Sequence, residues 1–319
     1  MLGFRDIAHE IKKRLVVTRI SNRPIVLMCN RRGGSTILLE MIASEPGMWI
    51  ANEPDAVLPE HPNYEFKKGN LPLMEHSQFF SLQGTDLRKF EIYIKNLLSL
   101  RYKTLGSIWS HKTIFTAKRV CVKIVNAPWM LDWFLDETDA HVVFMMRHPA
   151  AQALSVIRQN WDFGVKAYFN RPEELEKICT HQQIGYGQDI LRRGNIWETA
   201  ILDWVVGTHH GRISTRSNLT KIMFENLVTN PADFVENELI GKMGLTDADR
   251  MLRLLKRPSS SSNMSNTENI NSIRNGDSNR LLSSWMAKLD DSDKKCAQAI
   301  LDAFEVTAYT MDDPMPKVG

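Results

Sequence analysis

The sequence predicts an α/β fold in which a P-loop-like central parallel sheet is flanked by helices. Two short apolar runs, residues 25–29 and 141–146, predict strands that are buried on both faces, as in a parallel sheet. Each run leads through a turn into a helical pattern of apolar residues. A helical insertion and a C-terminal helical and lid region complete the predicted architecture. We also expect a strand at residues 221–224 and helices near residues 232–243 and 281–289.

The first strand is followed by the turn Arg32-Gly33-Gly34-Ser35-Thr36. Its two glycines allow the backbone to turn tightly and to approach a ligand, and its two hydroxyl residues suit the start of a helix. Free backbone N–H groups, two hydroxyls and a cation therefore meet at one point, which indicates an anion site, most naturally for phosphate. A plain helix cap is the alternative. The turn is not a Walker loop, because its basic residue precedes the glycines and no lysine follows them.

The second strand ends in Arg147-His148-Pro149, and Pro149 suits the first turn of a helix. An arginine at the carboxyl end of a parallel strand lies on the edge where open α/β sheets bind ligands. Nucleotide-hydrolysing P-loop proteins usually carry an acidic, metal-holding residue on a second strand. An arginine there instead indicates a second anion that is held without a metal.

Together, the two motifs resemble the signatures of the sulfotransferases that use 3′-phosphoadenosine 5′-phosphosulfate (PAPS). The family's first signature, Lys/Arg-Ser/Gly-Gly-Ser/Thr-Ser/Thr, is matched by Arg32 to Thr36. Its second, Arg-Asp/Asn-Pro with a serine eight residues after the arginine, is matched by Arg147, Pro149 and Ser155. His148 replaces the usual Asp or Asn, a modest change because that side chain mainly caps the helix. An arginine in the first motif is more similar to the carbohydrate and bacterial branches than to the cytosolic steroid and phenol enzymes.

The resemblance implies PAPS as co-substrate, adenosine 3′,5′-bisphosphate as product, and no metal. The 5′-phosphate would be held by Ser35, Thr36 and the backbone of Gly33 and Gly34. Arg32 would neutralise charge on the bridging oxygen as the S–O bond breaks. Arg147 and Ser155 would bind the 3′-phosphate; spacing alone supports Arg147, whereas Ser155 rests on the resemblance. Arginine suits these roles because it stays charged and binds phosphate with two N–H groups.

A base is also needed, and Glu53 is our candidate. The segment Asn52-Glu53-Pro54-Asp55 resembles the Glu-Pro element of carbohydrate-type and bacterial sulfotransferases. Pro54 favours an extended Glu53, which would project from a strand end into the cleft. A carboxylate in a surface turn is the alternative. Reserve bases lie in the insertion: His61, His76 and His111.

Lys123 stands inside an apolar strand, and a buried lysine needs an anionic partner. We therefore count Lys123 as catalytic, in contact with the sulfuryl oxygens; a snorkelling side chain is the alternative. The cytosolic relatives place a histidine after a lysine–threonine pair near this position. Here Ile124 and Val125 follow Lys123, so that histidine is missing.

Three further binding residues rest on weaker likenesses. Phe224 begins Phe224-Glu225-Asn226-Leu227, which resembles the family's Tyr-Glu-Asp-Leu strand end, where an aromatic ring approaches adenine. Arg274 and Gly276 resemble part of an Arg-Lys-Gly element that closes over the 3′-phosphate in the cytosolic branch. They lie in a polar stretch, residues 258–279, that is either a lid or a disordered linker.

Length and charge fit this interpretation. We expect the 319 residues to form one domain. Its segments are the 5′-phosphosulfate loop and strand (21–60), the insertion (61–117), the 3′-phosphate motif (118–158), a helical acceptor-side region (159–216) and a possible lid (258–280). The net charge of +3 suits anionic ligands but is too small to argue for nucleic acid.

The four cysteines are widely spaced, and two of them fall in expected strands, which favours reduced core thiols. The first residues lack the apolar core of a signal peptide, and no run of eighteen apolar residues follows. We therefore expect a cytoplasmic protein without a membrane anchor. The aromatic residues from Trp161 to Trp204 suit an acceptor wall, although Trp197 and Trp204, seven residues apart, are more typical of a core.

The sequence therefore predicts a sulfotransferase that moves the sulfuryl group of PAPS to a hydroxyl or amine of a small-molecule natural product or saccharide. A nucleotide kinase or NTPase is the first alternative; it would need magnesium ligands and would prefer ATP. A non-enzymatic polyanion-binding protein is the second. It would use the basic pairs Lys67-Lys68, Arg88-Lys89 and Arg192-Arg193, which are scattered in the way that solvated surface charges are.

Overall fold

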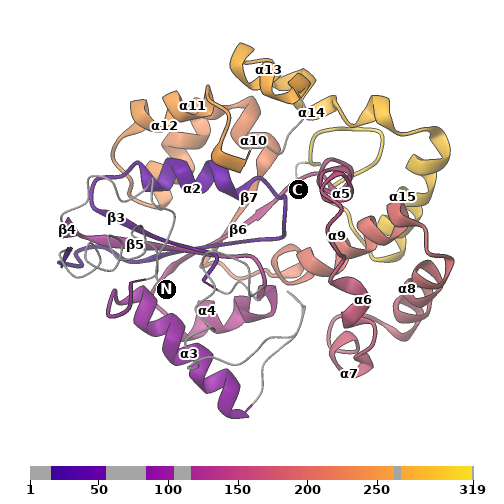
Figure 1. Cartoon of the computed structure of the whole chain (residues 1–319), viewed down its shortest axis with the longest axis horizontal. Helices are drawn as coiled ribbons and strands as arrows, with labels where there is room; N and C mark the ends of the chain where they lie inside the picture. Colours follow the sequence, from indigo (N-terminus) through magenta and orange to yellow (C-terminus); the bar gives the residue numbers. More distant parts are fainter. Residues whose placement is uncertain (1–15, 55–83, 104–115, 262–266, 318–319) are drawn as a thin grey trace, which may run out of the picture.

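The computed structural model describes residues 16–54, 84–103, 116–261 and 267–317. Within them, a five-stranded parallel sheet in the order β3-β5-β2-β6-β7 crosses the molecule (Figure 1). Its strands are β2 (Ile25–Cys29), β3 (Met48–Asn52), β5 (Arg119–Ile124), β6 (His141–Met146) and β7 (Leu219–Met223). Two short parallel strands, β1 (Val17–Thr18) and β4 (Thr116–Ala117), form a second sheet. The predicted α/β fold with a central parallel sheet is confirmed.

Helices cover both faces of the large sheet (Figure 1). One face carries α2 (Ser35–Ala43), α10 (Phe224–Thr229), α11 (Pro231–Phe234), a π-helical segment (Val235–Lys242) and α12 (Ala248–Leu255). The other carries α3 (Gly84–Leu98), the 3-10 turn Pro128–Met130 and α4 (Leu131–Glu137). Because both faces are packed, all five residues of β2 are buried, which explains its unbroken apolar sequence.

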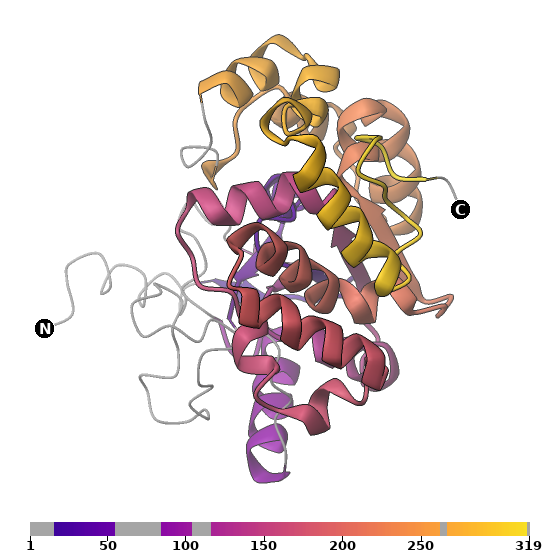
Figure 2. The same ribbon diagram turned by 90° about the vertical axis from the view of Figure 1, so that its right-hand side faces the viewer.

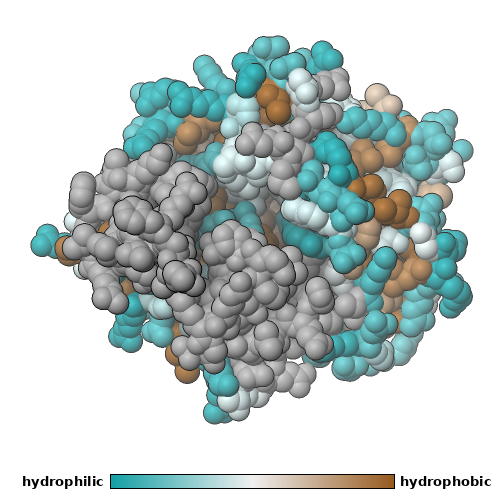
Figure 3. All heavy atoms as spheres, in the orientation of Figure 1, coloured by the Kyte–Doolittle hydropathy of each residue, from teal (hydrophilic) through white to brown (hydrophobic). Residues whose placement is uncertain are grey.

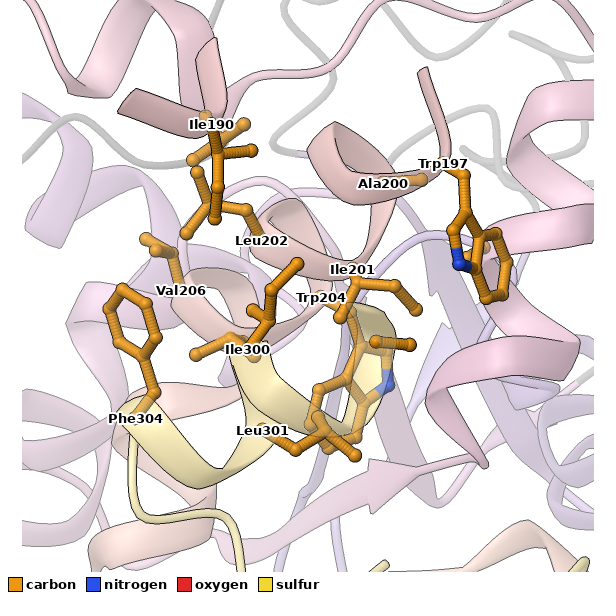
Figure 4. Close-up of a cluster of buried hydrophobic side chains, with 14 of the residues drawn as sticks. Ile190, Trp197, Ala200, Ile201, Leu202, Trp204, Val206, Ile300, Leu301 and Phe304 are labelled. Carbon is orange, nitrogen blue, oxygen red and sulfur yellow. The ribbon is translucent and has the colours of Figure 1, made fainter. Parts of the chain in front are cut away.

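A third hydrophobic cluster lies beside the sheet and is built from helices. They are α5 (Pro149–Arg158), α6 (Val165–Tyr168), α7 (Pro172–Leu175), α8 (His181–Arg193), α9 (Ile196–Ile213) and α15 (Asp291–Ala303). Trp197 and Trp204 of α9 point into this cluster with Ile300 and Leu301 of α15 (Figure 4). The prediction that these two tryptophans belong to the core is confirmed.

The C-terminal part of the chain packs mainly against the helical cluster beside the sheet. After α13 (Thr267–Asn275), α14 (Ser278–Ser283) and the 3-10 turn Met286–Lys288, helix α15 packs along α9 (Figure 2).

On the face shown in Figure 3, most atoms that are not grey belong to hydrophilic residues, with small hydrophobic groups between them. Within the described ranges, no helix is long and apolar enough to cross a membrane.

Three expected elements differ from the structure. We expected Phe224 to end a strand, but β7 stops at Met223, because its partner β6 ends at Met146 and offers no further pairing. One expected helix, residues 232–243, divides into α11 and the π-helical segment. Another, residues 281–289, ends early: the Ser284 hydroxyl donates to the backbone oxygen of Leu281, a contact that competes with helix continuation.

The insertion contains the helix that we predicted, α3, whose Phe90, Ile94 and Leu97 are buried against the sheet. Cys29 and Cys121 are buried and take part in no disulfide among the described residues, as expected for core cysteines. The reserve bases His61, His76 and His111 lie outside the described residues.

Candidate active site

A cavity of about 1090 Å³ opens at the carboxyl edge of the sheet. It lies beside β2, where the strand order turns in opposite directions, and this is the place where open α/β sheets bind ligands. Residues from the ends of four strands line it: Ser35 and Thr36 after β2, Glu53 after β3, Arg147 after β6 and Phe224 after β7. The volume is at the upper end of the range for small-molecule sites.

The loop after β2 holds a strained backbone that points helix α2 at the cavity. Gly34 has φ 88° and Arg32 has φ 65°, both in the left-handed region. A Cβ on Gly34 would lie 2.4 Å from Cδ2 of Phe224, so only glycine fits this position. No side chain caps the start of α2. Its first N–H groups are therefore left for a ligand, which favours the anion site over the plain helix cap.

Arg32 joins the two sequence motifs. Its Nε donates to Oγ of Ser155, 3.0 Å away on α5, so the first and second signatures meet at the same side of the cavity. Its guanidinium and that of Arg31 each lie 5.8 Å from the ring centroid of Trp161. Burial, together with the nearby charge of Arg158, lowers the pKa of Arg32 from its ordinary value. A negatively charged ligand would relieve both effects.

Arg147 is half-buried and faces the cavity. Its Cζ lies 4.6 Å from the centroid of the Phe224 ring, a cation–π contact. Burial lowers the pKa of Arg147 to about 10, against the attraction of Glu225. The side chain therefore keeps its charge at neutral pH. Its buried Nε finds no hydrogen-bond partner in the part of the chain that the structure describes. Such an unsatisfied donor suits an anionic ligand.

His148 caps helix α5, as the resemblance implied. Its Nδ1 accepts from the backbone N–H of Ala150 at 3.2 Å, so its proton must sit on Nε2, which donates to the carbonyl oxygen of Thr310 at 3.0 Å. Burial lowers the pKa of His148 to about 4 and keeps the ring neutral. The ring stacks on Trp285, another cavity-lining residue, with 4.3 Å between centroids.

Glu53 and Lys123 form an ion pair on the cavity wall, with 2.8 Å between Oε1 and Nζ. The Lys123 side chain is 4% exposed. The prediction of an anionic partner is confirmed, and the snorkelling alternative is wrong. The expected extended conformation of Glu53 is also wrong, because its φ is 51°. Its N–H still donates to the carbonyl of Lys123, and the backbone turns at that point, which brings the carboxylate back over the neighbouring strand.

The remaining predicted residues are divided. Phe224 and Gly276 line the cavity, whereas Arg274 is exposed on α13 and is not among the lining residues. In the described part of the expected lid, α13 is a helix whose Ser272 is buried and lines the cavity. This part of residues 258–279 is therefore folded, contrary to a disordered linker.

Several cavity residues were not anticipated from the sequence. Basic side chains from distant elements line it as well: Arg158, Lys166, Lys256, Arg257 and Lys288. Together with Arg31, Arg32, Lys123 and Arg147 they face three acidic residues, Glu53, Asp162 and Asp277, so the cavity is electropositive. Nothing in their local sequence marks them, because only the fold gathers them. Among the described residues, no group of three His, Cys, Asp or Glu side chains is placed to hold a metal ion.

Comparisons with known proteins give weak structural similarities. No family model and no curated protein sequence matches the chain. Mouse sulfotransferase SULT7A1 complexed with PAP shares 13% identity, with 91% of this chain and 87% of that chain covered, at a TM-score of 0.45. The sulfotransferase domain from the Synechococcus PCC 7002 olefin synthase shares 16% identity, with 90% of this chain and 96% of that chain covered, at a TM-score of 0.42. Sulfotransferase STF9 from Mycobacterium avium shares 10% identity, with 84% of this chain and 77% of that chain covered, at a TM-score of 0.37. At these TM-scores the similarities carry no argument about activity, which we infer from the residues of the cavity.

Proposed function

We propose that this chain is a PAPS-dependent sulfotransferase. It would transfer the sulfuryl group to a hydroxyl or amine of a small-molecule natural product or saccharide, by in-line displacement without a metal. One observation carries the proposal: the two motifs predicted to bind anions, the loop at Arg32 to Thr36 and the strand end at Arg147, line a single cavity. A donor with phosphates at both its 3′ and 5′ ends matches two such sites.

The donor is bound from two sides. The N-terminus of α2, with the hydroxyls of Ser35 and Thr36 and the backbone of Gly33 and Gly34, would take the 5′-phosphate. Arg147 and Ser155 would take the 3′-phosphate. The Ser155 hydroxyl accepts from Arg32 and still has its own hydrogen to donate to a phosphate oxygen.

The adenine base would lie near Phe224. Apolar residues of α10 and α12 line the cavity on this side: Leu227, Val228, Leu252 and Leu255. Gly276, at the end of α13, would close over the 3′-phosphate, with Arg274 reaching it only by a change in its exposed side chain.

The reaction needs one bond to form and one to break. The acceptor oxygen or nitrogen attacks sulfur, the bond from sulfur to the bridging oxygen breaks, and its electron pair stays on the 5′-phosphate of the bisphosphate product. Arg32 would stabilise the charge that develops on that oxygen, and Lys123 would contact the sulfuryl oxygens. The acceptor proton would pass to Glu53, whose carboxylate is oriented by Lys123.

The two alternatives are less well supported. A magnesium nucleotide site usually has an acidic residue at the end of a second strand, to hold the metal. Here Arg147 follows β6 instead, which does not favour a kinase or NTPase. Of the basic pairs of a polyanion-binding surface, Arg88-Lys89 and Arg192-Arg193 lie on separate helices, α3 and α8 (Figure 1), and Lys67-Lys68 lies outside the described residues. Arg192 and Arg193 also have acidic partners, Asp189 and Glu198, which offset their charge.

Thermal unfolding with added ligands tests the proposal. We expect adenosine 3′,5′-bisphosphate to raise the Tm, since a ligand at a hundred times its Kd stabilises the folded state by about 2.7 kcal/mol. ATP with magnesium should have a much smaller effect. A shift with ATP and magnesium alone would move the chain to the kinase class, and no shift with either ligand would remove the nucleotide site. With a bisphosphate site established, Glu53→Gln should lower turnover with PAPS by about 100-fold or more; unchanged turnover would exclude Glu53 as the base.

A further inference from the structure

Two buried residues, Glu225 and Tyr309, complete the wall behind Arg147, and Tyr309 lies near the end of the described chain. Glu225 lies 1% exposed at the start of α10. Its Oε1 accepts from the backbone N–H of His148 at 2.8 Å, and its Oε2 accepts from the hydroxyl of Tyr309 at 2.9 Å. Tyr309 is fully buried. Each carboxylate oxygen therefore has its own donor, and neither donor is Arg147.

Because both oxygens of Glu225 accept from other donors, the guanidinium of Arg147 stays available for a ligand in the cavity. The charges of Arg147 and Glu225 attract each other, which favours the charged form of both side chains. Still, among the described residues the hydrogen bonds of the Glu225 carboxylate come from His148 and Tyr309, and no ion pair joins it to Arg147. The carboxylate offsets the charge of Arg147 without occupying its N–H groups, and those groups remain directed to the cavity.

Losing the Tyr309 hydroxyl would remove one of the two hydrogen-bond donors to the Glu225 carboxylate. Glu225 Oε2 would be buried without a donor, which is costly. The guanidinium of Arg147 attracts Glu225, so an ion pair between the two would replace the lost hydrogen bond. The guanidinium would then be turned away from the ligand.

We propose that Tyr309 is a positioning residue for Arg147: by donating to Glu225, it keeps Arg147 free to bind the 3′-phosphate of the donor. The role rests on the proposed function and adds to it a residue that never touches the ligand. It is separate from folding of the strand end, because other contacts hold that backbone. Trp204 Nε1 donates to the carbonyl of Arg147 at 2.9 Å, and the ring of Tyr309 packs edge-on against His148 and Trp204.

Tyr309→Phe keeps the ring and removes only the hydroxyl. We expect the Kd for adenosine 3′,5′-bisphosphate, measured by calorimetry, to rise about 10-fold, which corresponds to about 1.4 kcal/mol. The Kd for adenosine 5′-monophosphate, which lacks the 3′-phosphate, should stay unchanged. Tyr168→Phe is the matched control: Tyr168 is buried in the same helical cluster, and its hydroxyl donates to the backbone carbonyl of Glu174 instead of to Glu225. It should change neither Kd.

Replacing the carboxylate gives a second, independent test. Because a neutral amide does not attract Arg147, Glu225→Gln should keep the preference for the bisphosphate within about threefold. In the double variant with Tyr309→Phe, most of the lost preference should return. A purely structural role of Tyr309 would give no such recovery.

The positioning role is overturned if Tyr309→Phe weakens both ligands equally, if it changes neither, or if Glu225→Gln loses as much preference as Tyr309→Phe. Failure of the proposed function looks different, because the wild-type protein would then show no preference for the bisphosphate over the monophosphate. That result would remove the role of Tyr309 together with the donor site.

Discussion

The two proposed anion sites of the cavity are built in different ways. The loop after β2 uses backbone N–H groups and hydroxyls from one stretch of seven residues, 30–36, and few distant residues contact it, among them Phe224 at Gly34 and Ser155 at Arg32. The site after β6 uses two side chains, Arg147 and Ser155, and the strand end that carries Arg147 is supported by residues from α9, α10 and the segment after α15. A site built from backbone is encoded locally, whereas a site built from a side chain needs the finished fold around it.

Arg32→Ala tests the catalytic part of the loop and should have the largest effect. We expect kcat with PAPS to fall about 100- to 1000-fold, because the charge that develops on the leaving oxygen loses its partner. The donor Kd should change only a few-fold, since Ala keeps the same left-handed backbone and the N-terminus of α2 remains. Steady-state kinetics and calorimetry separate the two quantities.

Arg31→Ala is the control for that variant, because Arg31 lies as close to Trp161 but bonds to the carbonyl of Asp162 instead of Ser155. It should lower kcat less than 10-fold. Equal losses in the two variants would assign the effect to general charge near Trp161.

Arg147→Ala tests the other site. The variant should bind adenosine 3′,5′-bisphosphate about 100-fold more weakly, because a charged hydrogen-bond donor to phosphate is lost. Binding of adenosine 5′-monophosphate should be nearly unchanged. If both nucleotides weaken together, Arg147 does not distinguish the 3′ end and the two sites are not separate.

Gly34→Ala should damage both sites at once. Its Cβ would push the Phe224 ring, on which Arg147 rests, and the residue would be strained at φ 88°. We expect a loss of about 2–4 kcal/mol in the free energy of unfolding, from overpacking and backbone strain together. Chemical denaturation measures it.

Gly185→Ala is the matched control, since Gly185 is an exposed residue inside α8 whose added Cβ would meet nothing within 4 Å. Helix propensity predicts a gain of about 1 kcal/mol there. If Gly34→Ala is equally well tolerated, Phe224 does not tie the two sites together.

The smallest effect should come from pH, and His148, next to Arg147, should account for part of it. His148 has an ordinary pKa of 6.5 and a folded pKa of about 4. Between these values the unfolded chain binds a proton that the folded chain does not, so stability is complete above pH 6.5 and falls as the pH drops towards 4. His148→Asn keeps a cap for α5 and removes this titration.

The stability difference between pH 7 and pH 4.5 should therefore be smaller in His148→Asn than in the wild type, by about 1–2 kcal/mol. His141 and His209, whose pKa values are also lowered to about 4, remain in both proteins and cancel in the comparison. An unchanged difference would mean that His148 is protonated in the folded protein.

The contrast between features that are encoded locally and features that need distant segments also explains what could be predicted from the sequence. β2 and β6 have the bounds that their apolar runs indicated, and the loop between β2 and α2 lies where its glycines placed it. The need of Lys123 for an anionic partner was also predictable, because a buried charge is costly wherever it lies.

Contacts that depend on distant segments were not predictable. Pro54 favoured an extended Glu53, but the ion pair with Lys123 on the neighbouring strand accompanies a left-handed turn. The role of Tyr309 has no local signal, because its hydroxyl meets Glu225 only after the chain following α15 has docked. Arg274 shows the reverse case: a local likeness to a binding element falls on an exposed helix position.

The central position of β2 has a consequence for synthesis on the ribosome. β2 is the first strand of the large sheet to be made, yet both of its neighbours, β5 and β6, follow about ninety or more residues later. A nascent chain therefore exposes two unpaired edges of an apolar strand until those partners emerge, which is a risk for aggregation and a reason to need a chaperone. Tyr309 emerges later still, so the ability to recognise the 3′-phosphate would be among the last properties that the growing chain acquires.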